Sequence, residues 1–163
     1  MHIEDLLQIV ESAEAERFVG ALFRRKFGSA PPDFPRHFLA LYSPDGSTWQ
    51  AVGYVNYWQR QAAFMAGGLV IEDRAYRTMP SQHRALIRSA GGIAERLMAS
   101  SLRMLPANDV VWAYVGDTRS GRVLGRVGYE HTQVERIMAY WTRHCSSDEK
   151  RRLAEEITAV GPF

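Results

Sequence analysis

The chain has 163 residues, of which 46% are hydrophobic and 23% are charged, and its formal net charge at pH 7 is +2. These fractions are typical of ordinary globular proteins and exclude the disordered and fibrous classes. The length predicts one domain with a sizeable core. The small net charge gives no reason to expect a nucleic-acid partner, and the basic run at residues 24–26 is predicted to be the solvated end of a helix.

Cysteine usage and the first residues predict a cytoplasmic protein. Cys145 is the single cysteine, which excludes an internal disulfide and is typical of a reducing compartment. Residues 1–11 carry acidic side chains where a secretory signal would carry basic ones. No apolar run is long enough to span a bilayer, so no membrane partner is expected.

The residues before Gly28 show a helical spacing of apolar side chains. These apolar positions are Leu6, Val10, Phe18, Leu22 and Phe23. The pattern predicts helix over residues 3–27, with a break near residues 12–15. Gly28 is expected to end this region, and the proline-rich segment 29–35 is predicted to be a rigid loop because proline cannot continue a helix.

Three runs rich in aromatic and β-branched residues follow and predict strands at about 36–43, 49–58 and 62–71. Ser43-Pro44-Asp45-Gly46 is a strong turn sequence between the first two, so the three strands are expected to form an antiparallel meander. Gly67-Gly68 predicts a bulge or a close backbone approach within the third strand, because glycine otherwise weakens a strand.

The second half of the chain alternates helices and strands. Helical periodicity over residues 79–105 continues in one phase through Gly91-Gly92, and these glycines are explained by close packing of the helix on a sheet. Residues 109–117 are almost uniformly apolar, as expected for a buried strand. A short helix at 120–127 and a strand at 129–141 follow. A capping box opening at Ser146 predicts a final helix at 147–160.

This order of elements predicts an α+β fold, a mixed α/β sandwich with helices on both faces of the sheet. An antiparallel meander is followed by a strand–helix–strand crossover in the same sheet. The whole chain, residues 1–163, is expected to be one domain, with helix 147–160 appended to it. The narrow apolar stripe of that helix predicts docking on the body of the protein or on a second subunit, so a homodimer is possible.

The segment between the last two predicted strands carries a spaced set of residues: Asp117, Ser120, Leu124, Arg126 and Gly128-Tyr129. In this spacing, and in element order over residues 36–141, the chain resembles the GNAT superfamily of acyl-CoA-dependent N-acyltransferases, as a divergent member. The resemblance implies a GNAT-like fold and acetyl-CoA or another acyl-CoA as co-substrate, with no metal. It also implies direct transfer of the acyl group to an amine acceptor, without an acyl-enzyme.

The resemblance assigns the pantetheine arm to the region around two strand ends. A strand end that splays from its neighbour leaves backbone groups that can bond an extended amide-bearing ligand. Backbone groups at Leu69, Val70 and Ile71 are expected there, with an oxyanion donor among them. Asp117 and Ser120 are expected to contact the same arm, although Asp117 could instead only cap the helix that follows.

The family's pyrophosphate loop, a basic residue before Gly-x-Gly or Gly-x-Ala at a helix start, has two candidate positions here. Backbone amides at a helix N-terminus bind phosphate well. Residues 76–87 lie at the right distance from the strand, whereas residues 89–98 match the glycine pattern better through Gly92 and Ala94. The continuous helical phase favours the first, which assigns phosphate contact to Arg77, Thr78, Ser81, Gln82 and His83. A solvated helix end is the alternative.

Three further residues are candidates for chemistry or acceptor binding. Glu72 follows the central strand and is the candidate general base, with a surface carboxylate as the alternative. Tyr54 and Tyr57 lie on one predicted strand and could line an acceptor pocket, or belong to the core. The five histidines show no metal-ligand spacing with Cys145 or with acids.

Leu124 stands where the family has the tyrosine that protonates the departing thiolate, and leucine cannot donate a proton. The sequence therefore leaves two alternatives to an N-acetyltransferase. One is a non-catalytic acyl-CoA-binding or regulatory protein that keeps the scaffold. The other is a repurposed scaffold that acts as a protein-interaction module, with the C-terminal helix as its dimer element.

Overall fold

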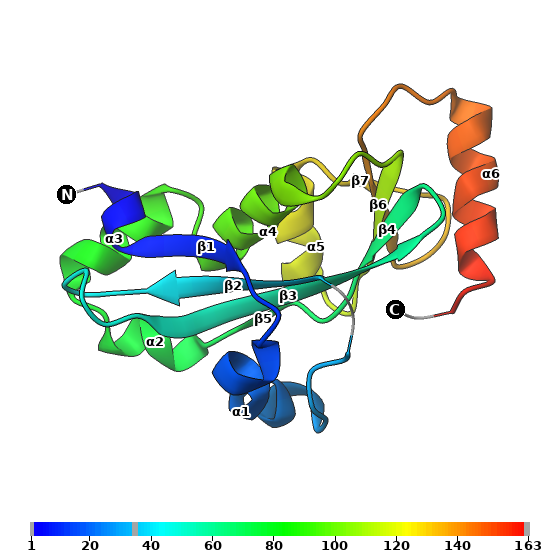
Figure 1. Cartoon of the computed structure of the whole chain (residues 1–163). Coiled ribbons are helices and arrows are strands. Elements are labelled where there is room, and N and C mark those ends of the chain that lie inside the picture. The colour runs from blue at the N-terminus through cyan, green and yellow to red at the C-terminus, as the bar shows by residue number, and fades with distance from the viewer. Residues whose placement is uncertain (1, 34–35, 162–163) are drawn as a thin grey trace. The chain divides into compact units, whose positions relative to one another are not determined.

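The computed structural model describes residues 2–33 and 36–161 (Figure 1). By its internal contacts the chain divides into two compact units, Met1–Asn56 with Gly68–Met104 and Tyr57–Gly67 with Leu105–Phe163. Each unit is described by itself below, and the expectation of one domain over residues 1–163 stays a prediction. Residues 34 and 35, the end of the predicted rigid loop, lie outside the described residues.

Eight strands form a mixed sheet in the order β1-β2-β3-β4-β6-β8-β7, with β5 paired to β3 alone. Antiparallel ladders join β1 to β2, β3 to β4 and β5, and β8 to β6 and β7, whereas β4 and β6 pair in parallel. The predicted meander followed by a strand–helix–strand crossover is therefore confirmed, as is the α+β class. None of the helices in the described part of the chain is both long and apolar enough to cross a membrane.

The first unit contains β1 (Leu7–Glu11), β2 (Arg36–Tyr42), the first part of β3 (Gln50–Arg60) and β5 (Val70–Ile71). Its helices are α1 (Ala15–Phe27), α2 (Asp73–Thr78), α3 (Ser81–Ser89) and α4 (Ile93–Met104), and a short 3₁₀ turn, η1 (Ile3–Asp5), precedes β1.

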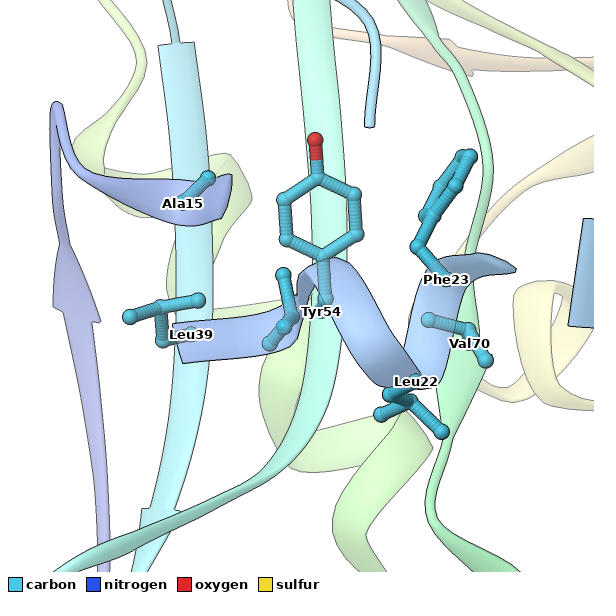
Figure 2. Packing of buried hydrophobic residues seen from close by; sticks show 7 residues of the cluster. Ala15, Leu22, Phe23, Leu39, Tyr54 and Val70 are labelled. Atoms are coloured by element: carbon cyan, nitrogen blue, oxygen red, sulfur yellow. The ribbon is translucent and has the colours of Figure 1, made fainter. Parts of the chain in front are cut away.

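Alternation along β3 gives the sheet of this unit two covered faces. Tyr54 lies in a buried cluster with α1, and Figure 2 shows its ring flanked by Leu39 of β2 and Phe23 of α1. The neighbouring Gly53 points to the opposite face, where an added Cβ would lie 3.2 Å from Cγ2 of Ile93 in α4. The helices α1 and α4 therefore cover opposite faces, as the sequence predicts.

The second unit contains the end of β3, then β4 (Ala63–Ala66), β6 (Val110–Tyr114), β7 (Glu130–His131) and β8 (Ile137–Trp141), with helices α5 (Thr118–Val127) and α6 (Ser147–Thr158). Trp112 and Ala139 form a buried cluster with Ala154 and Ile157 of α6. The C-terminal helix therefore docks on the body of the protein, one of the two predicted positions. On the other face, Tyr140 of β8 lies 3.3 Å from where a Cβ at Gly128, the C-cap of α5, would be.

Several local signals in the sequence lead to the expected geometry. Gly28 ends α1 in the left-handed region, with φ 75°. The predicted turn before β3 has Gly46 at φ 77°, and the Asp45 carboxylate accepts the backbone N–H of Ser47 at 2.9 Å. That backbone bond, with others from Ser47 and Thr48, lowers the pKa of Asp45 to about 2. Ser146 caps α6 by accepting the N–H of Glu149 at 3.2 Å.

The prediction of helix from residue 3 is wrong for residues 7–11, which form strand β1. Leu7 pairs with Tyr42 and Glu11 with Phe38 in an antiparallel ladder with β2. The apolar spacing of this segment also fits a helix, so only the distant partner strand decides between the two. The predicted break at residues 12–15 does coincide with the start of α1 at Ala15.

The predicted third strand, 62–71, is interrupted rather than bulged: β4 ends at Ala66 and β5 begins at Val70. A Cβ at Gly68 would lie 2.9 Å from the ring of Phe23, so glycine is needed for this close approach. The glycine pair therefore marks the right place, although the change of structure there is larger than predicted. The predicted strand 129–141 is likewise two strands, β7 and β8, joined by a turn.

The prediction of one continuous helix over residues 79–105 is wrong. Two helices, α3 and α4, occupy this range, and Gly91 and Gly92 separate them with φ 95° and 90°. These positive angles are favourable for glycine and strained for other residues. The glycine pair therefore separates two helices. The apolar residues of α3 and α4 happen to follow one helical periodicity, so the break cannot be recognised from the sequence pattern.

We expect Gly92→Ala to lower the free energy of unfolding by about 1–2 kcal/mol, because alanine resists the positive φ and its Cβ would lie 3.2 Å from the Tyr76 hydroxyl. Urea denaturation measures the change. Gly125→Ala in α5 is the matched control, because no atom lies within 4 Å of its added Cβ. The control should raise stability by up to about 1 kcal/mol. Equal stability of the two variants would contradict this account of α3 and α4.

Candidate functional site

The ladder between β4 and β6 ends while β6 still continues. Parallel pairing runs from Ala63–Val110 to Ala66–Ala113, and β6 extends to Tyr114, which is paired with Ile137 of β8 on its other side. Among the described residues, no ladder with β4 continues past Ala113. Backbone groups at such a strand end are available to an extended ligand that carries amides.

Asp117 and Ser120 lie at the start of α5 and bond to each other. The Asp117 carboxylate accepts the backbone N–H of Ser120 at 2.8 Å and its hydroxyl at 3.0 Å. The backbone bond is the main reason why the pKa of Asp117 is lowered. Asp117 therefore caps α5, the alternative that the sequence left open. Asp117 is nevertheless exposed and Ser120 is half-buried, so a ligand could still reach them.

The remaining residues of the spaced set close α5 and turn the chain into β7. Leu124 is buried at 4% exposure, so the position that carries tyrosine in the family points an apolar side chain into the protein. Gly128 is the C-cap of α5 and lies in the left-handed region, with φ 110°. Tyr129 is buried too, its ring 5.6 Å from that of Tyr140, and burial raises the pKa of its hydroxyl well above the usual value.

Glu72 follows β5 and has partners for both carboxylate oxygens. One oxygen accepts the backbone N–H of Arg74 at 3.1 Å and so caps α2. The other forms an ion pair with Arg25 of α1. Two of the roughly four lone-pair positions of the carboxylate are thus occupied, and a proton would have to be accepted at one of the others.

The strand residues before Glu72 are placed by packing. Val70 is buried in the α1 cluster, whereas Ile71 directs its side chain to the opposite face, beside Gly53. Leu69 is half-buried in the segment between β4 and β5. Only the backbone groups of these residues are candidates for a ligand contact, as the sequence interpretation required.

The start of α3 presents an exposed polar surface. The side chains of Arg77, Thr78, Ser81 and Gln82 are exposed. The first helical bond is donated by Arg84 to Pro80, so the amides of residues 81–83 have no partner among the described residues. His83 differs from the others, because its ring is buried and shares a hydrogen bond of 2.9 Å with the Tyr42 hydroxyl.

The start of α4 matches the glycine pattern, but two of its amides are occupied. Gly92 donates to the carbonyl of Ile87 at 2.8 Å, and Ile93 donates to the Tyr76 hydroxyl at 2.9 Å. The Glu95 carboxylate lies where a Cβ at Gly91 would be, at 2.5 Å. The sequence favoured residues 76–87 for phosphate binding because the helix was expected to continue through Gly91, and that reason is wrong. The free amides at the start of α3 and the occupied ones at the start of α4 favour the same position instead.

The two tyrosines proposed for acceptor binding are both in the core. Tyr54 and Tyr57 are each 0% exposed. The Tyr54 hydroxyl shares a hydrogen bond of 2.8 Å with Nδ1 of His37, and burial raises its pKa. Neither ring borders solvent in this structure. Both tyrosines therefore belong to the core, which is the alternative that the sequence left open for them.

Sequence analysis missed Asn56, which lies between these tyrosines on β3. It is 0% exposed, and neither its amide nitrogen nor its amide oxygen has a partner among the described residues. A buried polar group without a partner costs about 1–3 kcal/mol. The signal was available, because asparagine is depleted in strands and here stands alone in an apolar run.

The described residues contain no group of three or more His, Cys, Asp or Glu side chains that could hold a metal ion. Cys145 is buried with a free thiol, and burial raises its pKa. A buried thiol with a raised pKa is a poor nucleophile.

The amino-acid sequence matches no protein-family model and no curated protein. Its three-dimensional structure does match solved structures. YhhK from E. coli, a proposed N-acetyl transferase solved with coenzyme A bound, has a TM-score of 0.54 at 13% identity, over 83% of this chain and 98% of that one. Ard1 from Thermoplasma volcanium has a TM-score of 0.54 at 12% identity, over 85% of this chain and 99% of its own.

The chain has the GNAT fold. A proposed N-acetyltransferase from Lactobacillus plantarum agrees, with a TM-score of 0.50 at 17% identity over 85% of this chain and 99% of its own. The resemblance seen in the spacing from Asp117 to Tyr129 is thus confirmed at the level of the GNAT fold. Identities this low establish the fold and not the activity.

We expect Asp117→Ala to lower the free energy of unfolding at pH 7 by about 1 kcal/mol, because α5 loses its N-cap. The loss depends on pH. The folded pKa of Asp117 lies below its unfolded value, so the charged cap stabilises the protein above about pH 4 and this contribution fades as the pH falls through the folded pKa. Asp117→Asn keeps the acceptor oxygen and is the control. Urea denaturation at pH 7 and pH 3 measures both variants.

Two results would contradict this role of Asp117. One is a loss in Asp117→Asn as large as in Asp117→Ala at pH 7. The other is a difference between Asp117→Ala and the unmodified chain that is the same at both pH values.

Proposed function

We propose that this protein binds acetyl-CoA or another acyl-CoA and transfers the acyl group directly to an amine acceptor. The observation that carries the proposal is the GNAT fold together with the β4–β6 ladder that stops short of the end of β6. A protein of the same fold, YhhK, has been solved with coenzyme A bound. The partners would thus be a thioester and an amine, with no metal, nucleic acid or membrane.

The predicted acyl-CoA contacts fall in both units, and each set is proposed by itself. In the second unit, Asp117 and Ser120 would accept hydrogen bonds from the amide N–H groups of the pantetheine arm, through the oxygen lone pairs that the helix cap leaves free. In the first unit, the free amides and exposed side chains at the start of α3 would bind the pyrophosphate, with Arg77 as the cation. His83 would contribute only its backbone amide.

The transfer itself would form one bond and break one. The neutral amine would attack the thioester carbonyl, a backbone N–H near Val70 or Ile71 would stabilise the oxyanion, and the C–S bond would then break. The amine proton would pass to Glu72, directly or through water, at a lone pair that is occupied neither by Arg25 nor by the Arg74 amide. Because Leu124 has no proton to donate, the departing thiolate would take its proton from water.

A non-catalytic acyl-CoA-binding or regulatory protein is the second candidate. Two observations favour it specifically: Leu124 is buried at the position of the family's proton donor, and both oxygens of Glu72 are engaged. Both candidates require acyl-CoA binding, so one binding measurement tests what they share and one rate measurement separates them. A homodimer and a cytoplasmic location stay predictions.

We expect isothermal titration calorimetry to show acetyl-CoA binding in the micromolar range, or about −8 kcal/mol. Asp117→Asn combined with Ser120→Ala keeps the helix cap but removes a charge and a hydroxyl, and should weaken binding about tenfold, the effect of one to two hydrogen bonds. Thr158→Ala on α6 is the control and should bind as the unmodified chain does. No binding up to millimolar acetyl-CoA would overturn both candidates and leave the protein-interaction module.

We expect Glu72→Gln to lower the rate of acyl transfer about 100-fold or more, because glutamine cannot accept a proton, while acetyl-CoA affinity is unchanged. Release of CoA thiol is followed with a polyamine, an aminoglycoside and a peptide N-terminus as acceptors. Asp73→Asn is the matched control, because Asp73 is the adjacent carboxylate and pairs with Lys26 at 3.1 Å. Equal rates for Glu72→Gln and the unmodified chain would remove Glu72 from the mechanism. Acetyl-CoA binding without transfer to any of these amines would favour the non-catalytic candidate.

A further inference from the structure

A cleft of about 580 Å³ opens within the second unit, beside α5. One wall is formed by α5 and by residues 115–117, which precede it. The cleft is also lined by His131 of β7, by Met138 of β8 and by Arg136, which directly precedes β8. Small-molecule sites have volumes of about 300–1,000 Å³. The cleft is therefore large enough for a small molecule, and all its lining residues belong to one unit.

Basic side chains without partners line this cleft. Neither Arg122 nor His131 has a side-chain partner among the described residues. Arg136 bonds to the Tyr114 hydroxyl, and its Nε lies 3.6 Å from the neighbouring Glu135. The one acidic side chain in the lining, Asp117, already accepts two bonds from Ser120. The cleft thus presents two basic side chains without partners in the described part of the chain, together with the Asp117 carboxylate near the start of α5.

Three glycines line the same cleft without a structural need to be glycine. An added Cβ at Gly116 or Gly125 would meet no atom within 4 Å, and at Gly121 it would make an ordinary contact of 3.4 Å with Val115. None of the three has a positive φ. By contrast, Gly53 and Gly68 are crowded. Two glycines inside a helix cost about 1 kcal/mol each relative to alanine, and an open helix wall lets a ligand approach the backbone.

The cleft overlaps the acyl-CoA motif only at the start of α5, because the N-cap residue Asp117 lines the cleft as well. At about 100° per residue, Ser120 lies about 40° from Leu124 on one flank of the helix. Gly121, Gly125 and Arg122 lie about 60°, 100° and 160° from Leu124 on the other flank. Leu124 is buried, whereas Gly125 and Arg122 are exposed along the cleft.

We propose that this cleft binds a small molecule with an anionic head group, a carboxylate or a phosphate. The head group pairs with Arg122 and Arg136, and the apolar body of the molecule lies along Gly121 and Gly125 against Met138. The ligand is small because the cleft has a volume of about 580 Å³, and anionic because its unpaired side chains are basic. Neither Arg122 nor Arg136 is among the residues predicted to contact the acyl-CoA.

NMR titration of the ¹⁵N-labelled chain, without acyl-CoA, tests this site. The probes are benzoate, phenyl phosphate and the neutral benzyl alcohol, which share a ring and differ in the head group. We expect the amide signals of Gly116, Gly121 and Gly125 to shift with one or both anions, with a dissociation constant in the millimolar range or tighter, and with benzyl alcohol at least tenfold weaker. The better anion identifies the head group as carboxylate or phosphate.

Variants then locate the contacts. Gly125→Leu keeps a good helix former in α5 but fills the cleft, so its melting temperature should not fall while binding weakens at least tenfold. Arg122→Ala should weaken binding at least fivefold. Arg119→Ala is the matched control on the same helix, because Arg119 does not line the cleft, and it should leave binding unchanged.

Four results would overturn the proposal. These are no glycine shifts with either anion, equal binding of benzyl alcohol, unchanged affinity in a folded Gly125→Leu variant, and equal losses in Arg119→Ala and Arg122→Ala. The last would mean diffuse attraction to a basic helix. Saturating acetyl-CoA should leave the anion affinity unchanged, and competitive displacement of the anion would show that the cleft belongs to the acyl-CoA site.

Discussion

The candidate site depends on the interruption of one strand at residues 67–69. Gly68 has no side chain, so the ring of Phe23 can come within 2.9 Å of the position that a Cβ would take. Because the strand breaks there, β4 pairs with β6 for four residues and β5 pairs with β3 alone. A continuous strand could have extended the ladder along β6 and occupied the backbone groups that the proposed ligand needs. The same interruption places Glu72 at the start of α2.

The helix α5 has two distinct sides with different demands. One side carries the Asp117 cap and the buried Leu124, so it is fixed by local hydrogen bonds and by packing. The other carries Gly121 and Gly125, where neither packing nor backbone conformation requires glycine. Stability alone would favour alanine at these two positions. Gly121 and Gly125 therefore mark the part of α5 where a requirement other than stability can act.

The structure offers more groups suited to binding an acyl-CoA than groups suited to catalysing its reaction. The free amides at the start of α3 suit a phosphate-bearing ligand, and the end of β6, where no ladder with β4 continues among the described residues, suits an amide-bearing one. The groups that would transfer protons are less favourably arranged. Glu72 is paired with Arg25, and Leu124 has no acidic proton to donate to a thiolate. The buried Asn56, with no partner among the described residues, is a further polar group that neither candidate function yet employs.

The sequence by itself determined the local features: the Asp45 turn, the Gly28 and Gly128 helix ends, the Ser146 cap, and the spacing from Asp117 that indicated the fold. These depend on backbone angles and hydrogen bonds between residues close in the chain, so short patterns predict them. Tertiary structure alone decided that residues 7–11 form a strand, because their partner β2 lies some thirty residues away in the chain. It also decided the burial of Tyr54, Tyr57 and His83 and the existence of the cleft, because burial and free volume depend on packing between distant segments.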